Sequence, residues 1–235
     1  MAQGNFQEDA IKTGKGDLKI TFIGHATLMF SFGGKIIHVD PWTKFVDYST
    51  MPKADIILVT HEHGDHLDLS AVEKIIKKGT NIYCTKLCED SLNKLVNNSK
   101  LSNVNIGVLP NGKEAKAYEI GILAVPAYNL SPGEGGRTYH PKGSGNGYVV
   151  DFGGTKVYIA GDTENIPEMK DLKDIDIAFL PVNRPYTMTP EMAVDAVKMF
   201  NPKILYPYHY GETDIDQLKN MLKDTKIEVR IRNMQ

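Results

Sequence analysis

The segment 56–68 reads IILVTHEHGDHLD. Its first four residues are aliphatic and mostly β-branched, which predicts a buried strand over residues 56–59. Directly after this strand come His61, His63, Asp65 and His66. Residues two apart in an extended chain point to the same side, so His61 and His63 can hold one ion together.

Imidazole and carboxylate ligands in one short segment predict a metal site for one or two Zn²⁺ ions, and Mn²⁺ or Fe²⁺ suit the same ligands. Gly64 lets the backbone turn, so Asp65 and His66 are expected at the start of a helix over about 69–78, aimed at the same ion or at a second one. The chain has seven histidines in 235 residues, which favours a metal site over a merely solvated histidine-rich loop. Glu62 alternates away from the histidines, so we expect neither a ligand nor a base there.

The pattern H-x-H-x-D-H resembles the signature of the metallo-β-lactamase-fold hydrolases, and the resemblance extends over nearly the whole chain. It implies a four-layer αββα sandwich, of the α/β class, with a one- or two-metal site at one edge. The supporting motifs are GHAT (24–27), VDP (39–41), AGDT (160–163), YTM (186–188) and PYHYG (207–211). This set is most similar to the lactonase-like branch, which includes the ascorbate-6-phosphate lactonase and, more remotely, the N-acyl phosphatidylethanolamine phospholipase D.

The composition indicates one domain over residues 17–235 after a polar, loosely held lead-in at residues 1–16. Hydrophobic residues make up 41% of the chain, enough for a core, and no linker divides it. The formal net charge of −2, without a basic block, argues against nucleic-acid binding. Two cysteines are too few for a disulfide framework. No stretch approaches 18 apolar residues and no apolar export segment opens the chain, which predicts a cytoplasmic protein without an integral membrane segment.

Upstream of the central segment, strands are expected over 18–23, 27–32 and 35–39, with Gly33-Gly34 as a two-residue turn. His25 lies between the first two strands. The resemblance places it near the metals, and we expect either a role beside the ligands or substrate, or a structural hydrogen bond. Asp40 either orients a metal-binding imidazole or caps its strand in an Asp-Pro turn. His38 is interpreted as a core or surface histidine.

Downstream, the pattern alternates between strands and helices, which fits an α/β layered domain. Strands are expected over 81–84, 106–109, 114–118, 122–125, 148–152, 156–159, 175–180, 204–206 and 226–231. Helices are expected over 87–96, from Thr189-Pro190 onward, and over 214–223. Thr189 is a typical N-cap, and proline is favoured at the first helical position.

The resemblance also implies ligands in the second half of the chain. Asp162 is expected to bridge two metals, since a carboxylate offers two oxygens. His209 is expected on the second ion, together with Asp65 and His66.

Asn129 stands where the family normally has another metal-binding histidine. His140 lies in a glycine-rich loop at 131–147 that is long enough to fold over an active site. We therefore interpret His140 either as a replacement ligand or as a substrate-binding or structural residue.

These features predict a metal-dependent hydrolase. A metal-bound hydroxide near neutral pH is expected to open a lactone, or to cleave a phosphodiester or another ester, in a small substrate that can be anionic. Catalytic roles are predicted for Asp65, His25 and Tyr186. Substrate contacts are predicted for Asn129, Arg184 and Lys142, although isolated surface cations are the commoner explanation of a lysine or arginine.

The alternative is a catalytically degenerate metal-binding or regulatory module, which the residue at position 129 prompts. It predicts weak occupancy of the first metal site and no turnover. A β-CASP-type nuclease would need a large inserted domain and a basic groove, and a flavodiiron-like protein would need an attached flavodoxin-like domain. Neither fits 235 residues of this composition. The substrate, the physiological metal and formation of a homo-oligomer are left open.

Overall fold

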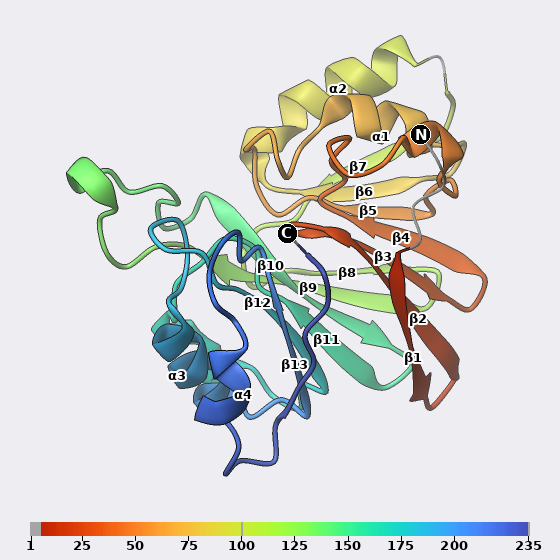
Figure 1. Cartoon of the computed structure of the whole chain (residues 1–235). Coiled ribbons are helices and arrows are strands. Elements are labelled where there is room, and N and C mark those ends of the chain that lie inside the picture. The colour runs from red at the N-terminus through yellow and green to blue at the C-terminus, as the bar shows by residue number, and fades with distance from the viewer. Residues whose placement is uncertain (1–5, 100, 235) are drawn as a thin grey trace.

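Within residues 6–99 and 101–234, which the computed structural model describes, two mixed β-sheets of seven strands each pack face to face (Figure 1). The first sheet consists, in spatial order, of β1 (Gln7–Thr13), β2 (Gly16–Gly24), β3 (Thr27–Phe32), β4 (Lys35–Val39), β5 (Ile56–Leu58), β6 (Asn81–Cys84) and β7 (Asn105–Val108). The second consists of β14 (Glu228–Val229), β13 (Ile204–Tyr208), β12 (Ile177–Pro181), β11 (Thr155–Ile159), β10 (Gly145–Phe152), β9 (Ile120–Ala127) and β8 (Glu114–Ala117).

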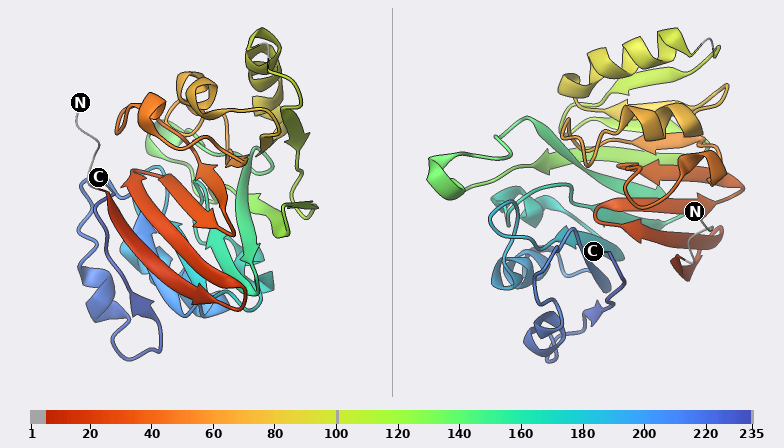
Figure 2. Two further views of the ribbon diagram at one scale, coloured as in Figure 1. Left: turned by 90° about the vertical axis from the view of Figure 1, so that its right-hand side faces the viewer. Right: turned by 45° about the horizontal axis from the view of Figure 1, so that its top comes forward.

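Helices cover the outer faces of the two sheets. The pair α1 (Leu69–Ile75) and α2 (Glu89–Asn98) covers the first sheet, and the pair α3 (Pro190–Phe200) and α4 (Gln217–Met221) lies against the second (Figure 1). Figure 2 shows the two pairs on opposite sides of the sheets. Short 3₁₀ turns are η1 (Tyr48–Thr50), η2 (Lys86–Cys88), η3 (Glu134–Gly136) and η4 (Pro167–Asp171). The expected four-layer αββα sandwich is therefore confirmed.

Each sheet is built on the same plan. Strands β1 to β4 form an antiparallel meander, and β4 to β7 then run parallel. Strands β8 to β11 and β11 to β14 repeat this order in the second sheet. The chain segments that follow β4, β5, β11 and β13 consequently meet at one edge of the sandwich.

Aromatic side chains hold the two sheets together. Phe30 of β3 lies with its ring centroid 5.4 Å from Phe152 of β10 and 6.0 Å from Phe179 of β12. All three rings are fully buried, and burying a phenylalanine side chain contributes roughly 1.5–3 kcal/mol. A separate apolar cluster, which includes Ile57, Val72 and Leu92, packs α1 and α2 onto the first sheet.

Local sequence signals explain several element boundaries. Gly33 and Gly34 both have positive φ, 56° and 73°, as a two-residue type I′ hairpin turn requires, and the expected turn is confirmed. The Thr189 side chain accepts a hydrogen bond from the Met192 amide at 3.2 Å, with proline at the first helical position. The expected start of α3 is therefore also confirmed.

The N-terminal segment differs from the expectation of a loosely held lead-in. Residues 7–13 form β1, which pairs with β2 along its whole length. The Asp9 carboxylate accepts hydrogen bonds from Arg232 Nη2 at 2.7 and 2.6 Å. Asp9 and Arg232 are 223 residues apart, so the composition of the N-terminal segment alone does not predict this contact. Residues 1–5 of the expected lead-in lie outside the described residues.

The elements near the end of the chain are shorter than expected. The helix α4 covers Gln217–Met221 and the strand β14 only Glu228–Val229. A helix that crosses a bilayer needs about 20 apolar residues, and the helices among the described residues include none of that kind.

Candidate metal centre

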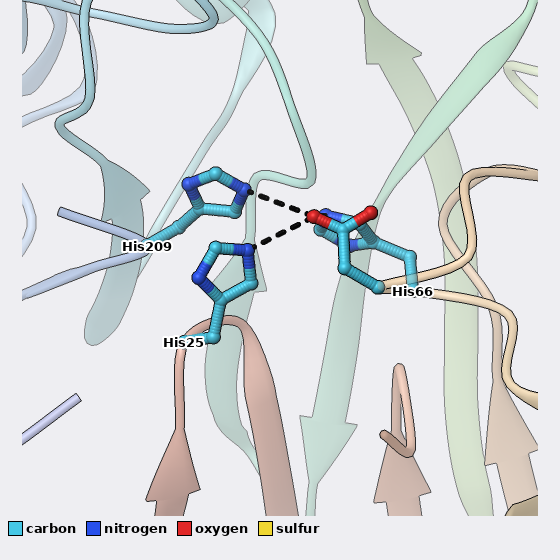
Figure 3. A group of neighbouring side chains, drawn as sticks. His25, His66 and His209 are labelled. Atoms are coloured by element: carbon cyan, nitrogen blue, oxygen red, sulfur yellow. Dashed lines mark hydrogen bonds and ion pairs between the residues drawn. The ribbon is translucent and has the colours of Figure 1, made fainter. Parts of the chain in front are cut away.

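Histidine and aspartate side chains from five separate chain segments converge at the edge of the sandwich. They form three groups, and within each group the ligand atoms lie within 4.8 Å of one another. The first group is His61, His63 and His140, the second is His25, Asp65, His66 and His209, and the third is His61, His66 and Asp162. Figure 3 shows the rings of His25, His66 and His209 converging from different parts of the chain. The structure therefore brings together every residue that the sequence analysis named as a metal ligand.

The turn after β5 places the central histidines. The amides of His66 and Leu67 both donate to the His63 carbonyl, at 2.9 and 2.8 Å, which reverses the chain within four residues. The Asp68 side chain then caps α1 by accepting from the amides of residues 70 and 71. As a result His61 and His66 are buried at the site, whereas Glu62 is exposed to solvent.

Asp40 holds His66 from behind. Its Oδ2 lies 2.8 Å from His66 Nδ1, and its two oxygens also accept from the Thr60 amide and hydroxyl, at 2.8 and 2.6 Å. All three side chains are completely buried. The geometry favours the first of the two alternatives for Asp40, an orienting role, because it leaves His66 Nε2 directed into the site.

Asp162 lies between the histidine groups. Its Oδ2 is 3.3 Å from His140 Nε2 and 3.3 Å from His209 Nε2, and its Oδ1 is 3.5 Å from His66 Nε2. Burial alone would raise the pKa of Asp162, but the neighbouring imidazoles hold it well below the usual value. The carboxylate is therefore an anion. In turn, burial opposes the charge on His66, and Asp162 and Asp40 outweigh it and raise the pKa of His66 to about 9.

A close approach of the backbone places Asp162. Gly161, with φ of +66°, precedes it, and a Cβ atom there would lie 2.6 Å from the Asn146 carbonyl oxygen. The Gly161 amide donates to the Tyr208 hydroxyl at 2.9 Å. Only glycine combines this φ with this approach, so the glycine before Asp162 is required by the geometry.

His25 joins the second group through both its side chain and its backbone. Its Nε2 is 3.1 Å from Asp65 Oδ2, and its ring centroid is 3.7 Å from that of His209. The His25 carbonyl accepts from the His209 amide, and its own amide donates to the Met234 carbonyl, both at 2.9 Å. His25, Asp40 and His209 all have left-handed backbone conformations, with φ of 55°, 44° and 46°.

The unsatisfied polar atoms test whether these residues fit a metal ion. Among the described residues, six buried side-chain nitrogen or oxygen atoms lack a hydrogen-bond partner, and five belong to this cluster. They are His66 Nε2, His140 Nε2, Asp162 Oδ1 and both ring nitrogens of His209. Leaving a buried polar group unpaired costs about 1–3 kcal/mol, and imidazole and carboxylate are the ligands that zinc, iron and manganese prefer. The residues fit a divalent metal centre.

The sixth such atom is Nδ1 of His38, which is fully buried away from this cluster and has its Nε2 3.0 Å from the Pro52 carbonyl. Of the two interpretations of His38, a core or a surface histidine, its burial agrees with the first.

The structure also places Tyr186, which was predicted to have a catalytic role, and two residues that were predicted to contact substrate. Tyr186 is 43% exposed and its ring packs edge-on against Tyr139, with centroids 4.9 Å apart. Arg184 Nη1 is 2.6 Å from Glu164, and Lys142 Nζ is 2.7 Å from Glu168. Both cations therefore have acidic partners within the chain, and their substrate contacts stay predictions.

Two residues beside the site were not expected from the sequence. Trp42, the single tryptophan, lies with its ring centroid 5.2 Å from that of His25. Glu164 is 1% exposed and accepts from the amides of Leu130 and Ser131, at 2.9 and 3.0 Å. Glu164 directly follows the AGDT motif, and this position is the one sequence feature that could have pointed to a role for Glu164 at the site.

Comparison with known proteins adds the family. A family model described as the beta-lactamase superfamily domain matches residues 19–209. The UPF0173 metal-dependent hydrolase of Thermococcus onnurineus is 33% identical over 228 residues, which cover 91% of this chain and 96% of that protein. The corresponding protein of Archaeoglobus fulgidus is 29% identical over 227 residues, covering 91% and 94%.

Solved structures agree with this assignment. A candidate metal-dependent hydrolase from Parabacteroides distasonis has a TM-score of 0.87 and 53% identity, covering 98% of this chain and 100% of that one. Igni18, a metallo hydrolase from Ignicoccus hospitalis, has a TM-score of 0.73 and 25% identity, covering 92% and 95%.

Proposed function

The chain belongs to the β-lactamase superfamily, among relatives that are metal-dependent hydrolases, and from this premise we propose that it hydrolyses a lactone or a phosphodiester with two divalent metal ions. One observation carries the proposal: among the described residues, the buried Nε2 atoms of His66, His140 and His209 lack hydrogen-bond partners and lie 3.3–3.5 Å from the Asp162 carboxylate, whose Oδ1 lacks a partner as well. An ordinary protein interior pairs such atoms.

We assign the ligands from their grouping. One ion would be held by His61, His63 and His140, whose ligand atoms lie within 4.8 Å of one another. The other would be held by Asp65, His66 and His209, and Asp162 would serve both. Zinc is the first candidate, with manganese and iron as alternatives. When bound, such ions act as Lewis acids on a substrate oxygen and lower the pKa of water towards about 7.

The protein side chains would hold and orient these groups. His25 fixes the Asp65 carboxylate through the 3.1 Å contact, and Asp65, which is 34% exposed, supplies the carboxylate of the second group. We propose that Asp65 Oδ2 would take the proton that the attacking water loses and return it to the leaving oxygen of the substrate, with His25 Nε2, its immediate partner, sharing the proton in between. Tyr186, at the surface, would direct its hydroxyl to the bound substrate.

The degenerate-module alternative depended on the residue at position 129. His140 lies beside His61 and His63, with ring centroids 5.0 Å from each, and so supplies the imidazole that the alternative counted as missing. This placement supports an enzyme over a binding module.

Metal content and turnover measured together test the proposal. Protein purified without chelator and loaded with zinc, manganese or iron is analysed for metal per chain, then assayed with simple lactones and with bis-(p-nitrophenyl) phosphate. We expect about two ions per chain, and turnover of one substrate class that is lost in Asp162→Ala. Two ions without turnover of either class would refute the substrate proposal, and no bound ion would refute the metal centre.

A further inference from the structure

Asn129 is bound to His140 at three places. Its side-chain Oδ1 accepts from the backbone amide of His140 at 2.9 Å and lies 2.9 Å from His140 Nδ1. Its backbone amide donates to the His140 carbonyl at 2.8 Å. Asn129 is only 7% exposed and His140 only 4%. The loop between them, which contains η3, extends away from the sandwich at the left of Figure 1. Asn129 therefore closes this loop at its base.

A second contact fixes which way the Asn129 amide faces. Its Nδ2 donates to the Tyr186 carbonyl at 2.9 Å. A carbonyl only accepts hydrogen bonds, so the NH₂ group must face Tyr186 and the oxygen must face His140. The Asn129 oxygen and nitrogen are therefore assigned from their hydrogen-bond partners, because the side-chain amide has the same shape when it is flipped.

The amide orientation determines the tautomer of His140. Because Asn129 Oδ1 only accepts, the proton of a neutral His140 must lie on Nδ1. The Nε2 lone pair is then free, and this atom lies 3.3 Å from Asp162 Oδ2 on the side of His61 and His63. A hydrogen-bond acceptor behind a histidine is the usual way in which a protein prepares that histidine to bind a metal.

We propose that Asn129 is a positioning residue: its carboxamide fixes His140 in the Nδ1–H tautomer with Nε2 directed at the first ion, and ties the Tyr186 segment to the same point. This inference rests on the proposed metal centre. It replaces the predicted substrate contact of Asn129, because the amide is buried and occupied at both ends by the protein.

The two proposed metal positions then differ in the charge of the groups that hold and surround their ligands. His66 is backed by a carboxylate, Asp40, whereas His140 is backed by a neutral amide. The second group also contains a carboxylate of its own, Asp65, whereas the first group has only imidazoles besides Asp162. Negative charge near a ligand strengthens cation binding, so the site of His140 is the weaker of the two and fills second.

A zinc titration against a chromophoric chelator, on the full chain, tests this. Wild type is expected to bind two ions with unequal affinity. Asn129→Leu removes every side-chain hydrogen bond and should weaken the lower-affinity site about 10- to 100-fold, the usual effect of losing an orienting partner, and leave the other unchanged. Because Asn129 acts through His140, the double variant Asn129→Leu/His140→Ala should be no worse than His140→Ala alone.

Two further variants separate positioning from a merely structural effect. Asn81→Ala removes an asparagine of β6 whose side chain donates to the Gly79 carbonyl and that belongs to none of the three ligand groups, and it should keep both zinc affinities. Asn129→Asp keeps the acceptor facing His140 but places a carboxylate against the Tyr186 carbonyl. It should retain the weaker site within a few-fold of wild type while the protein becomes less stable.

The tautomer gives a readout that needs no metal. Long-range ¹H–¹⁵N spectra of histidine-labelled apo-protein should show Nδ1–H for His140 in wild type and in Asn129→Asp, and lose this preference in Asn129→Leu. Wild-type zinc affinities in Asn129→Leu, or an unchanged tautomer, would overturn the inference alone. If wild type binds no zinc, the proposed function fails together with it.

Discussion

Asp40 and His66 follow neighbouring parallel strands, β4 and β5, and their side chains meet at 2.8 Å in a place that solvent does not reach. The pair is thus built by the segments that follow two neighbouring strands of the first sheet. An imidazole fixed in this way presents Nε2 to a cation without having to reorient, which lowers the entropic cost of binding.

Replacing Asp40 tests this pair. Asp40→Asn keeps the size of the side chain but turns one of its two acceptor oxygens into an NH₂ group, so the Thr60 amide and the His66 ring no longer each face an acceptor. We therefore expect the affinity for the tighter ion to fall about 10- to 100-fold. Zinc titration measures the effect. Asp174→Asn, at a side chain that is 88% exposed, is the matched control and should bind zinc as wild type does. Equal affinities in the two variants would contradict an orienting role.

Removal of metal should lower the thermal stability. A ligand at 100 times its dissociation constant adds about 2.7 kcal/mol, which for a chain of this length corresponds to roughly 5–10 °C in Tm. Circular dichroism melts with excess zinc and with chelator give the difference. In Asp162→Ala the two melting curves should nearly coincide. A wild-type Tm that does not respond to chelator would argue against a bound ion.

The glycine before Asp162 should resist substitution. In Gly161→Ala the new methyl group would meet the Asn146 carbonyl at 2.6 Å, so we expect a loss of about 2–5 kcal/mol from overpacking and the left-handed backbone together, with weaker zinc binding. Gly34→Ala is the control, because Gly34 has φ of +73° but open space around it. Urea unfolding should show the smaller loss in Gly34→Ala; equal losses would show that the close approach is unimportant.

The contact between Asp9 and Arg232 should make stability depend on pH. Burial raises the pKa of Asp9, but hydrogen bonds from Arg232 and Tyr206 outweigh it and hold the pKa below the usual value. Its stabilisation is therefore complete above the unfolded-state pKa of about 3.9 and is lost as the pH falls through the folded-state pKa. Asp9→Asn should cost about 1–3 kcal/mol at pH 7, and the difference from wild type should shrink below about pH 4.

Asp17→Asn is the matched control for this measurement. Asp17 lies on the same hairpin, but its ion pair with Lys12 is exposed, and exposed pairs contribute only about 0–1 kcal/mol. Urea unfolding at several pH values compares the variants. An Asp9→Asn protein that is destabilised equally at pH 3 and pH 7 would contradict the assignment to an ionised carboxylate.

The fold was expected from the resemblance to a known family and is confirmed, whereas the expected ligand set stays a prediction that the observed grouping of the side chains supports. A buried strand that ends in H-x-H-x-D-H fixes the side of the sheet on which His61 and His63 emerge, and strand ends of parallel strands share one edge. The resemblance, and not this local pattern, led us to expect ligand roles for Asp162 and His209, which follow β11 and β13 of the second sheet.

What the sequence did not predict depends on contacts between distant segments. The contact between Asn129 and His140, on which the proposed positioning role rests, forms only because the loop returns His140 to Asn129, 11 residues later. Arg184 is partnered by Glu164, which no local pattern connects to it. For the same reason, the polarity of residues 7–13 did not predict that they form β1 and pair with β2.

The left-handed backbone at His25, Asp40 and His209 has a further consequence. Each such non-glycine residue stores conformational strain of about 1–3 kcal/mol. Here His209 belongs to the cluster of unpaired ligand atoms, and His25 and Asp40 contact members of it, His209 and His66. The rest of the sandwich must offset this energy. Replacement of these residues by glycine would relieve the strain while removing the chemistry, so selection for heat resistance alone is expected to work against the active centre.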